Sequence, residues 1–464
     1  MKLTSLALVV SLSTCSALAV SANANTQDNS QDNSHENTKA NAKAMYSTST
    51  AAKDQVTLTN WADANFNHWS FQNMGIHPNL MVPRDGKVSM LAENLDPSIA
   101  ALKFDYAGQQ FTVNQAMIND RTDGYVIIKD GQVVHEQYFG TFGPKDHHMW
   151  ASSTKSLVGQ AVGLLVEQGK LDPNKTVDSY IEELKGSHFG EQTVRTVLNM
   201  TSALDYSEDY ANISPGTMHY EYFRRLGLVP AYDLMKLDPT KDDTPRGLLE
   251  FAPQFKQNPD LAVNHKYEYH SPNVDVAGWL IARVSGQPLH QFIAENIWYK
   301  LGVEHDATFM TDMTYTPVAT GGFTSTLRDF ARVGIAMANH GNYNGQQVFS
   351  KAWLADTFAL TDDEKEHMQR SIYKSKEAGV YDEWLEGYKN YLWVHDSKKG
   401  IATFRGVFGQ HLYINQEQNL VIATFSSAKS ASNAARATNK PRLAAFEAIA
   451  NHYQQESSLA NLDK

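Results

Sequence analysis

Residues 150–169 read Trp-Ala-Ser-Ser-Thr-Lys-Ser-Leu-Val-Gly-Gln-Ala-Val-Gly-Leu-Leu-Val-Glu-Gln-Gly, and this stretch organises the rest of the sequence. Between residues 156 and 168, apolar side chains fall on nearly every face of a helix, and Gly169 ends it. A helix that is hydrophobic all round is a buried one. The side chains at its N-terminus, Ser152 and Lys155, are therefore expected to be held rigidly inside the molecule.

Ser152 and Lys155 are three residues apart, so on a helix they project from the same face. A serine hydroxyl is a weak nucleophile until a neighbour takes its proton, and a lysine whose pKa is lowered by burial can do so. The positive field and free amides of the helix N-terminus favour a developing oxyanion. The alternative interpretation makes Ser152 a helix cap and Lys155 a solvated cation.

The same spacing occurs in two other serine–lysine pairs, Ser371/Lys374 and Ser426/Lys429. The first pair lies in a charged stretch that looks exposed, and the second follows a strand into a polar loop. Only Ser152 and Lys155 precede a fully apolar helix, and a lysine at the start of a buried helix is not readily solvated. Among the three pairs Ser152 and Lys155 are therefore the best candidates for a nucleophile and its base, and the pattern alone leaves the helix-cap interpretation open.

Strands are predicted near both ends of the chain. Residues 124–129 and 132–138 flank Asp130-Gly131, which is the strongest two-residue hairpin signal. A second pair of strands, 410–414 and 420–425, is separated by a polar turn. These two pairs are expected to form one sheet.

The middle of the chain, about 155–340, is rich in helical patterns, and residues 443–453 predict a closing helix. The order of elements predicts an α+β domain over 56–464, in which the two ends build the sheet. A helical subdomain is inserted at roughly 160–320.

The first 24 residues have the pattern of a signal peptide: a charged start, an apolar stretch and Ala-Asn-Ala before the cleavage site. A lipoprotein signal ending at Cys15 is less favoured, because Thr14 is bulkier than such sites usually carry. Residues 25–55 are polar and predict a disordered linker. The mature chain, which lacks the single cysteine, is expected to be periplasmic or secreted.

Composition excludes several classes of protein. The formal net charge of −11 argues against nucleic acid as the main partner, and no apolar run after the signal is long enough for a membrane span. Nucleophile-elbow, P-loop and dinucleotide-binding glycine motifs are absent from the sequence. Two histidine pairs, His147/His148 and His265/His270, lack a third ligand at a convincing spacing, so no metal site is expected.

The stretch Trp150 to Ser156 resembles the active-site signature of the serine β-lactamase/penicillin-binding-protein superfamily. Further segments resemble that superfamily in the same order: Val194 to Ser202 with Ser207 to Tyr210, Tyr269-His-Ser-Pro-Asn273, Gly321 to Ser325 with Arg328 to Arg332, and Gly406-Val-Phe-Gly-Gln410. The resemblance covers roughly residues 100–455. It is nearest to the class C-like branch that contains esterases and 6-aminohexanoate-dimer hydrolases.

The resemblance implies a β-lactamase/transpeptidase-like α+β fold, with an antiparallel sheet flanked by helices and an all-helical subdomain. It implies that Ser152 is the acylated nucleophile, Lys155 its proton acceptor and Tyr269 the phenol that shares the proton transfer. Tyr267 is a rival for the phenol role. The oxyanion hole would be formed by the backbone amides of Ser152 and Gln410.

Two departures from the superfamily pattern bear on the substrate. Where β-lactamases carry Lys-Thr-Gly, this chain has Val407-Phe408-Gly409, and where class C enzymes carry asparagine it has Ser271. Ser271, Phe408 and Gly409 are expected to contact the substrate. Both changes favour a substrate less polar than penicillin.

We therefore expect an exported serine hydrolase that cleaves a small-molecule ester or amide through an acyl-enzyme on Ser152, with no metal or organic cofactor. The alternatives are a β-lactamase or D-Ala-D-Ala peptidase and, from another class, a non-catalytic binding protein on the same fold. The oligomeric state is open, a monomer being one option.

Overall fold

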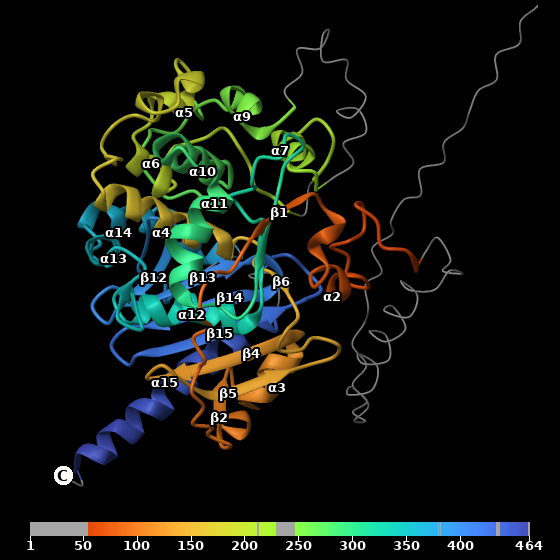
Figure 1. The fold of residues 1–464 in the computed structure, drawn as a ribbon, viewed down its shortest axis with the longest axis vertical. Helices are drawn as coiled ribbons and strands as arrows, with labels where there is room; N and C mark the ends of the chain where they lie inside the picture. The colour runs from red at the N-terminus through yellow and green to blue at the C-terminus, as the bar shows by residue number, and fades with distance from the viewer. Residues whose placement is uncertain are drawn as a thin grey trace, which may run out of the picture.

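The computed structural model describes residues 54–210, 213–228, 246–378, 380, 382–432 and 437–462. At its centre lies a seven-stranded sheet in the order β11-β12-β13-β14-β15-β4-β5, with every neighbouring pair antiparallel (Figure 1). The strands are β4 (Thr122–Lys129), β5 (Gln132–Tyr138), β11 (Gly387–Lys389), β12 (Leu392–Asp396), β13 (Ile401–Gly406), β14 (Gln410–Asn415) and β15 (Leu420–Ser426).

The sheet joins the two ends of the chain, as the sequence predicts. β4 pairs with β15 along its whole length, from Lys129 opposite Leu420 to Thr122 opposite Ser426. The β4–β5 turn consists of Asp130 and Gly131, whose φ angles of 52° and 77° are those of a tight hairpin turn. Both predicted strand pairs and their antiparallel arrangement are confirmed.

Alternate side chains of each strand point to opposite faces of the sheet and pack in different layers of the fold. Val126 and Ile128 of β4 face the larger core, which they share with α4 (Ser153–Glu167) and α12 (Leu327–Ala338). Tyr125 and Ile127 face the opposite side, beneath α3 (Val113–Asn119) and α15 (Asn439–Leu462). The closing helix is longer than the 443–453 predicted, because Pro441 sits in its first turn, where a missing N–H costs nothing.

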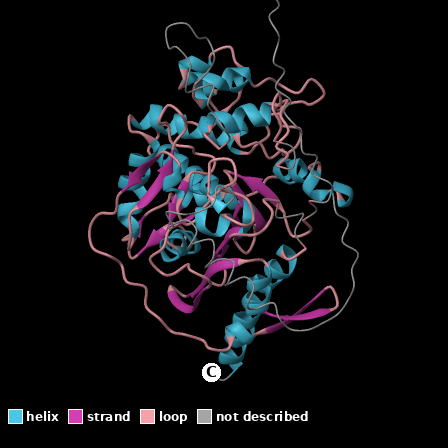
Figure 2. Ribbon diagram, turned by 90° about the vertical axis from the view of Figure 1, so that its right-hand side faces the viewer, coloured by secondary structure: helices cyan, strands magenta, loops and turns pink. Residues whose placement is uncertain are grey.

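Helices gather beyond α4, on the side away from α15 (Figures 1 and 2). They are α5 (His188–Glu191), α6 (Val194–Leu198), α7 (Met218–Arg225), α9 (Leu248–Phe251), α10 (Pro272–Ser285) and α11 (Leu289–Ile293). α4 packs against α10 and α13 (Lys351–Phe358) and also against β12, β13 and β14. It therefore lies between the helices and the sheet, buried on nearly every face as its composition predicts.

A small sheet contributes a strand to the stretch 160–320, so the described residues of this stretch are not purely helical. Its strands are β1 (Asn79–Val82), β6 (His148–Met149), β7 (Ala307–Met310) and β8 (Phe323–Ser325). β6 pairs with β8 and leads directly into the serine–lysine stretch.

The remaining elements lie at the periphery. They are α2 (Asn67–Ser70), α14 (Asp362–Gln369) and the hairpins β2–β3 (Lys103–Tyr106, Gln109–Thr112) and β9–β10 (Asn342–Tyr343, Gln346–Gln347). The expected signal peptide, Cys15 and nearly all of the 25–55 linker lie outside the described residues. None of the helices in the described ranges has the length and apolarity to cross a membrane.

Candidate active site

Ser152 precedes the first turn of α4 and is held there from several sides. Trp150 donates from its backbone to the Phe323 carbonyl and from its indole to the Ser325 hydroxyl at 2.8 Å. Ala151 takes a left-handed φ of 47°, so the chain turns sharply between β6 and the helix. The serine hydroxyl is thereby fixed on a rigid, fully packed element.

The Lys155 ammonium donates to the Ser152 hydroxyl at 2.9 Å and to the Thr320 carbonyl at 2.6 Å. Its side chain is only 2% exposed. Burial lowers the pKa of Lys155 from its ordinary value to about 8, and the carboxylates of Glu208 and Asp275 oppose this shift. The sequence-based expectation of a buried lysine that can be neutral near its working pH thus has a structural counterpart.

Tyr269 is the phenol that the structure places at the serine. Its hydroxyl is hydrogen-bonded to Ser152, and the Lys155 ammonium lies 5.2 Å from the centre of its ring. Burial and the Glu208 carboxylate raise the pKa of Tyr269 well above its usual value. The rival Tyr267 is fully buried against Tyr388, 4.6 Å between ring centres, and its hydroxyl has no partner in the described part of the chain.

Ser271 does not reach the cavity beside Ser152, contrary to expectation. It is buried, and both its amide and its hydroxyl donate to the Glu208 carboxylate, each at 2.6 Å. Glu208 also accepts from the Tyr210 hydroxyl at 2.5 Å and itself lines the cavity. A carboxylate from a distant segment therefore takes the place that sequence reasoning gave to the serine.

Phe408 and Gly409 also face away from the cavity, which corrects their assignment as substrate contacts. The Phe408 ring packs edge-on against Phe71, with 5.0 Å between centres. The Gly409 carbonyl accepts from the buried Arg442 guanidinium at 2.7 Å. The physical reason is the turn between β13 and β14. Phe408 has a left-handed φ of 62° in this turn, and its side chain therefore points into the core.

Gln410, whose backbone amide was expected in the oxyanion hole, does not line the cavity beside Ser152. It is fully buried in β14, opposite Gly406, and its side-chain amide donates to the carbonyls of Val407 at 3.2 Å and Ser426 at 2.7 Å. Its side chain thus braces the turn instead of facing a substrate.

Gly406 and Val407 are the residues of this segment that line the cavity together with Ser152. A Cβ atom on Gly406 would lie 2.5 Å from the Trp150 carbonyl, so the end of β13 runs directly beside the approach to Ser152. Within the described ranges, neither the Ser152 amide nor the Val407 amide donates to a protein acceptor. These two amides are suited to stabilise an oxyanion.

The cavity beside Ser152 has a volume of about 650 Å³ and is both aromatic and acidic. Aromatic lining comes from Tyr106, Tyr206, Tyr210, Tyr267, Tyr269, Tyr373, Trp384 and Trp393, and carboxylates come from Glu208, Asp209, Glu268, Asp382 and Glu383. Trp393 stacks on Tyr269 with 5.5 Å between ring centres. Sequence reasoning missed Glu208 and Trp393; the aromatic and acidic run 206–210 was the available signal for Glu208.

Arg405 is a cation in the cavity wall, but its guanidinium is already engaged. It pairs with Asp382 at 2.7 Å, donates to His395 at 2.9 Å and lies 4.9 Å from the Trp393 ring. Burial and the Arg405 charge lower the pKa of His395 to about 3, so this imidazole is a neutral acceptor. Arg405 is therefore poorly placed to take up a substrate carboxylate.

The other candidate residues lie elsewhere. Ser371 and Ser426 are buried and donate to the Met368 carbonyl and the Thr122 hydroxyl, respectively. In the described part of the chain, neither hydroxyl is hydrogen-bonded to the ammonium of its lysine. His147 bonds to the Asp306 carbonyl at 2.6 Å. Across the described residues, no three histidine, cysteine, aspartate or glutamate side chains form a group that could hold a metal ion.

Comparisons with known proteins agree with this geometry. The beta-lactamase family matches residues 114–445. The 6-aminohexanoate-dimer hydrolase of Paenarthrobacter ureafaciens is 28% identical over 380 residues, which cover 81% of this chain and 89% of that protein.

Solved structures show the same fold. A protein from Bacillus anthracis that carries the provisional name 6-aminohexanoate-dimer hydrolase superposes with a TM-score of 0.74 at 24% identity, covering 88% of this chain and 99% of its own. A family VIII carboxylesterase superposes with a TM-score of 0.51 at 14% identity, covering 78% of this chain and 99% of its own. The chain belongs to the beta-lactamase family and is a serine hydrolase.

Proposed function

We propose that the chain hydrolyses ester or amide bonds through an acyl-enzyme intermediate on Ser152. The observation that carries the proposal is the contact of one hydroxyl with two proton-transfer groups. The Ser152 hydroxyl is bonded to the buried Lys155 ammonium at 2.9 Å and to the Tyr269 phenol. A nucleophile within hydrogen-bond reach of a base that is itself oriented is the arrangement that activates serine.

In the acylation step, neutral Lys155 takes the Ser152 proton as the serine oxygen attacks the carbonyl carbon. The negative charge on the carbonyl oxygen would lie between the amides of Ser152 and Val407. Collapse of the tetrahedral intermediate breaks the bond to the leaving group. That alcohol or amine leaves with a proton supplied through Lys155 and Tyr269.

Deacylation uses the same groups in reverse. A water molecule loses a proton to the Lys155–Tyr269 pair and attacks the acyl carbon, the same amides hold the oxyanion, and Ser152 recovers its proton as the acid departs. The two titrating groups lie close enough to act as a pair.

The charge of the cavity supports an ester or amide substrate over a β-lactam. Penicillins carry a carboxylate, and this cavity is lined by five carboxylates and by three cations, Arg405, Lys266 and Lys440. Arg405 is engaged by Asp382 and His395, and Lys266 by Glu268. Bringing an anionic substrate among like charges is unfavourable. The sequence argument from Val407 in the place of a lysine does not carry over, because the residues that line the cavity are 405–407 and begin with the cation Arg405.

Export to the periplasm or medium is part of the proposal and is supported by the pattern of residues 1–24 alone. The mass of the mature N-terminus after expression with the full leader tests it. Cleavage after Ala24 is expected, and an intact Met1 or a lipid on Cys15 would contradict it.

A hydrolysis screen tests the proposed activity. Purified chain is assayed with p-nitrophenyl esters, linear amides including the 6-aminohexanoate dimer, D-Ala-D-Ala peptides and nitrocefin, each beside the Ser152→Ala variant. We expect turnover of esters or linear amides that disappears in the variant. Turnover confined to nitrocefin or to D-Ala-D-Ala peptides would replace the proposal with the alternatives, and complete inertness would favour a binding protein.

A further inference from the structure

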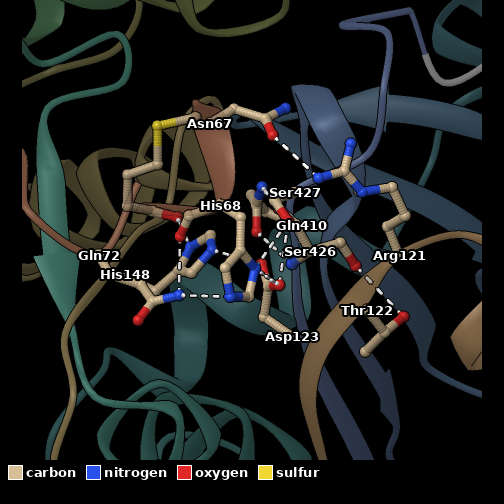
Figure 3. Close-up of polar contacts among 12 residues, drawn as sticks. Asn67, His68, Gln72, Arg121, Thr122, Asp123, His148, Gln410, Ser426 and Ser427 are labelled. Carbon is tan, nitrogen blue, oxygen red and sulfur yellow. Dashed lines mark hydrogen bonds and ion pairs between the residues drawn. The ribbon is translucent and has the colours of Figure 1, made fainter. Parts of the chain in front are cut away.

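Next to the turn between β13 and β14, which carries Val407, lies a buried cluster of side chains that the mechanism above does not use. Asp123 accepts from His68 at 2.5 Å and from Ser427 at 2.9 Å on one carboxylate oxygen, and from His148 at 3.1 Å on the other (Figure 3). Asp123, His148 and Ser427 are each at most 2% exposed. We call Asp123, His68, His148 and Ser427 the Asp123 cluster.

Further hydrogen bonds hold both histidine rings in place. The second ring nitrogen of His148 lies 2.9 Å from the Met149 carbonyl, so both of its nitrogens face acceptors. The second ring nitrogen of His68 lies near the Gln72 amide and the Thr141 hydroxyl. The histidines hold the pKa of Asp123 well below its usual range, although burial opposes this.

One arm of the cluster reaches the strand before the nucleophile. His148 belongs to β6, four residues before Ser152, and its ring stacks on Phe425 with 4.8 Å between centres. The hydrogen bond to Asp123 therefore ties β6 to the start of β4.

The other arm reaches the turn that carries Val407. Ser427 follows β15; beside it, the Ala428 amide donates to the Phe408 carbonyl at 3.1 Å, and Asn67 of α2 donates to the Ala428 carbonyl at 2.8 Å. On its other side, the backbone of Ser426 is bonded to the Gln410 side chain (Figure 3). The same side chain donates to the Val407 carbonyl. The segment 426–428 thus holds the Phe408 carbonyl directly and the Val407 carbonyl through Gln410.

We propose that the Asp123 cluster is a positioning unit for the oxyanion hole, which holds the strand leading into Ser152 in register with the turn that presents Val407. This inference rests on the proposed function. None of the four side chains would touch the substrate; they act through the two backbone amides. Misplacing a donor by about 1 Å can cost on the order of 10²-fold in rate, so a rigid brace between the two halves matters for catalysis.

The experiment compares an ester with the matching thionoester, in which sulfur replaces the carbonyl oxygen. Sulfur is larger and accepts hydrogen bonds poorly, so a well-formed oxyanion hole discriminates strongly in favour of the ester. kcat/KM is measured for both substrates with the wild-type chain, Asp123→Asn and the milder Ser427→Ala. The controls are Asp329→Asn, which breaks the buried pair with Arg332 at 3.0 Å, and Ser350→Ala, which removes the buried cap of α13.

We expect Asp123→Asn to lower kcat/KM for the ester by on the order of 10²-fold and the ester-to-thionoester ratio by on the order of tenfold. Ser427→Ala should shift the ratio in the same direction by less, and the two controls should leave it unchanged. If Asp123→Asn does not fold, Ser427→Ala decides.

Equal losses for both substrates, or no loss, would overturn the positioning role while leaving the proposed function standing. A wild-type chain that hydrolyses no ester would overturn the proposed function, and this inference with it.

Discussion

The Lys155 ammonium lies 2.9 Å from the Ser152 hydroxyl, and its other hydrogen-bond partner is the carbonyl oxygen of Thr320. Both partners are formally neutral, so loss of the lysine charge breaks no direct ion pair with a carboxylate. Burial can then lower the pKa of Lys155 with little opposition at short range. Such a lysine is fitted to accept a proton from the serine.

The first prediction concerns pH. Because Lys155 acts only when neutral, kcat/KM should rise with pH through its pKa, near 8. The Asp275 carboxylate raises that pKa, so Asp275→Asn should lower it and move the acidic limb to lower pH. A pH profile of ester hydrolysis checks the direction. A limb that stays in place would mean that Asp275 is neutral in this range or that another group controls the limb.

The second prediction concerns the proton relay. Lys155→Ala and Tyr269→Phe should each slow acylation by on the order of 10²–10⁴-fold. Since they serve one relay, the double variant should be little worse than either single variant. Pre-steady-state acylation rates for the four proteins provide the measurement. Tyr267→Phe is the matched control and should remain near the wild-type rate; multiplicative losses would show that the two groups act independently.

The third prediction concerns Gly406. A methyl group there would lie 2.5 Å from the Trp150 carbonyl and 2.9 Å from the Gln410 Cβ, so β13 must move away from the approach to Ser152. Gly406→Ala should therefore lower kcat/KM by on the order of 10²-fold, with a smaller effect on KM. Gly75→Ala is the control, because a methyl group at residue 75 meets nothing within 4 Å. An unchanged kcat in Gly406→Ala would contradict the placement of Val407 in the oxyanion hole.

The fourth prediction concerns substrate choice. Short-chain p-nitrophenyl esters should be hydrolysed with a far higher kcat/KM than nitrocefin, because the cavity is acidic and Arg405 is engaged by Asp382. Releasing that guanidinium with Asp382→Asn should improve nitrocefin hydrolysis relative to ester hydrolysis. The opposite ranking in the wild-type chain would restore a β-lactamase assignment.

Local patterns predicted much of the fold. The Asp130-Gly131 turn with alternating strands, and a helix apolar on every face, are decided by neighbours in the sequence. The serine–lysine spacing likewise depends on a single helical turn. For this reason the hairpin expected at 124–129 and 132–138 and the buried helix expected after Ser152 agree with β4, β5 and α4.

The segment Gly406–Gln410 could not be placed in the same way. Which residues of 404–410 face Ser152 depends on how β13 pairs with β14 and on the left-handed turn at Phe408, and both are set by the assembled sheet. An offset of one residue exchanges the cavity-facing side for the core.

The partners of Ser271 and Tyr269 come from far along the chain. Glu208 lies 63 residues before Ser271, and Trp393 comes from a strand beyond the helical region. A local pattern such as the run 206–210 can mark Glu208 as a candidate, but it does not signal which distant residue the carboxylate contacts.

The most direct test of the account is covalent labelling of the nucleophile with a fluorophosphonate, followed by intact-mass measurement and peptide mapping. The wild-type chain and Ser426→Ala should each gain one adduct on Ser152, and Ser152→Ala should gain none while keeping its melting temperature. An adduct on another serine, or a folded wild-type chain that remains unlabelled, would contradict the claim that Ser152 carries the acyl group.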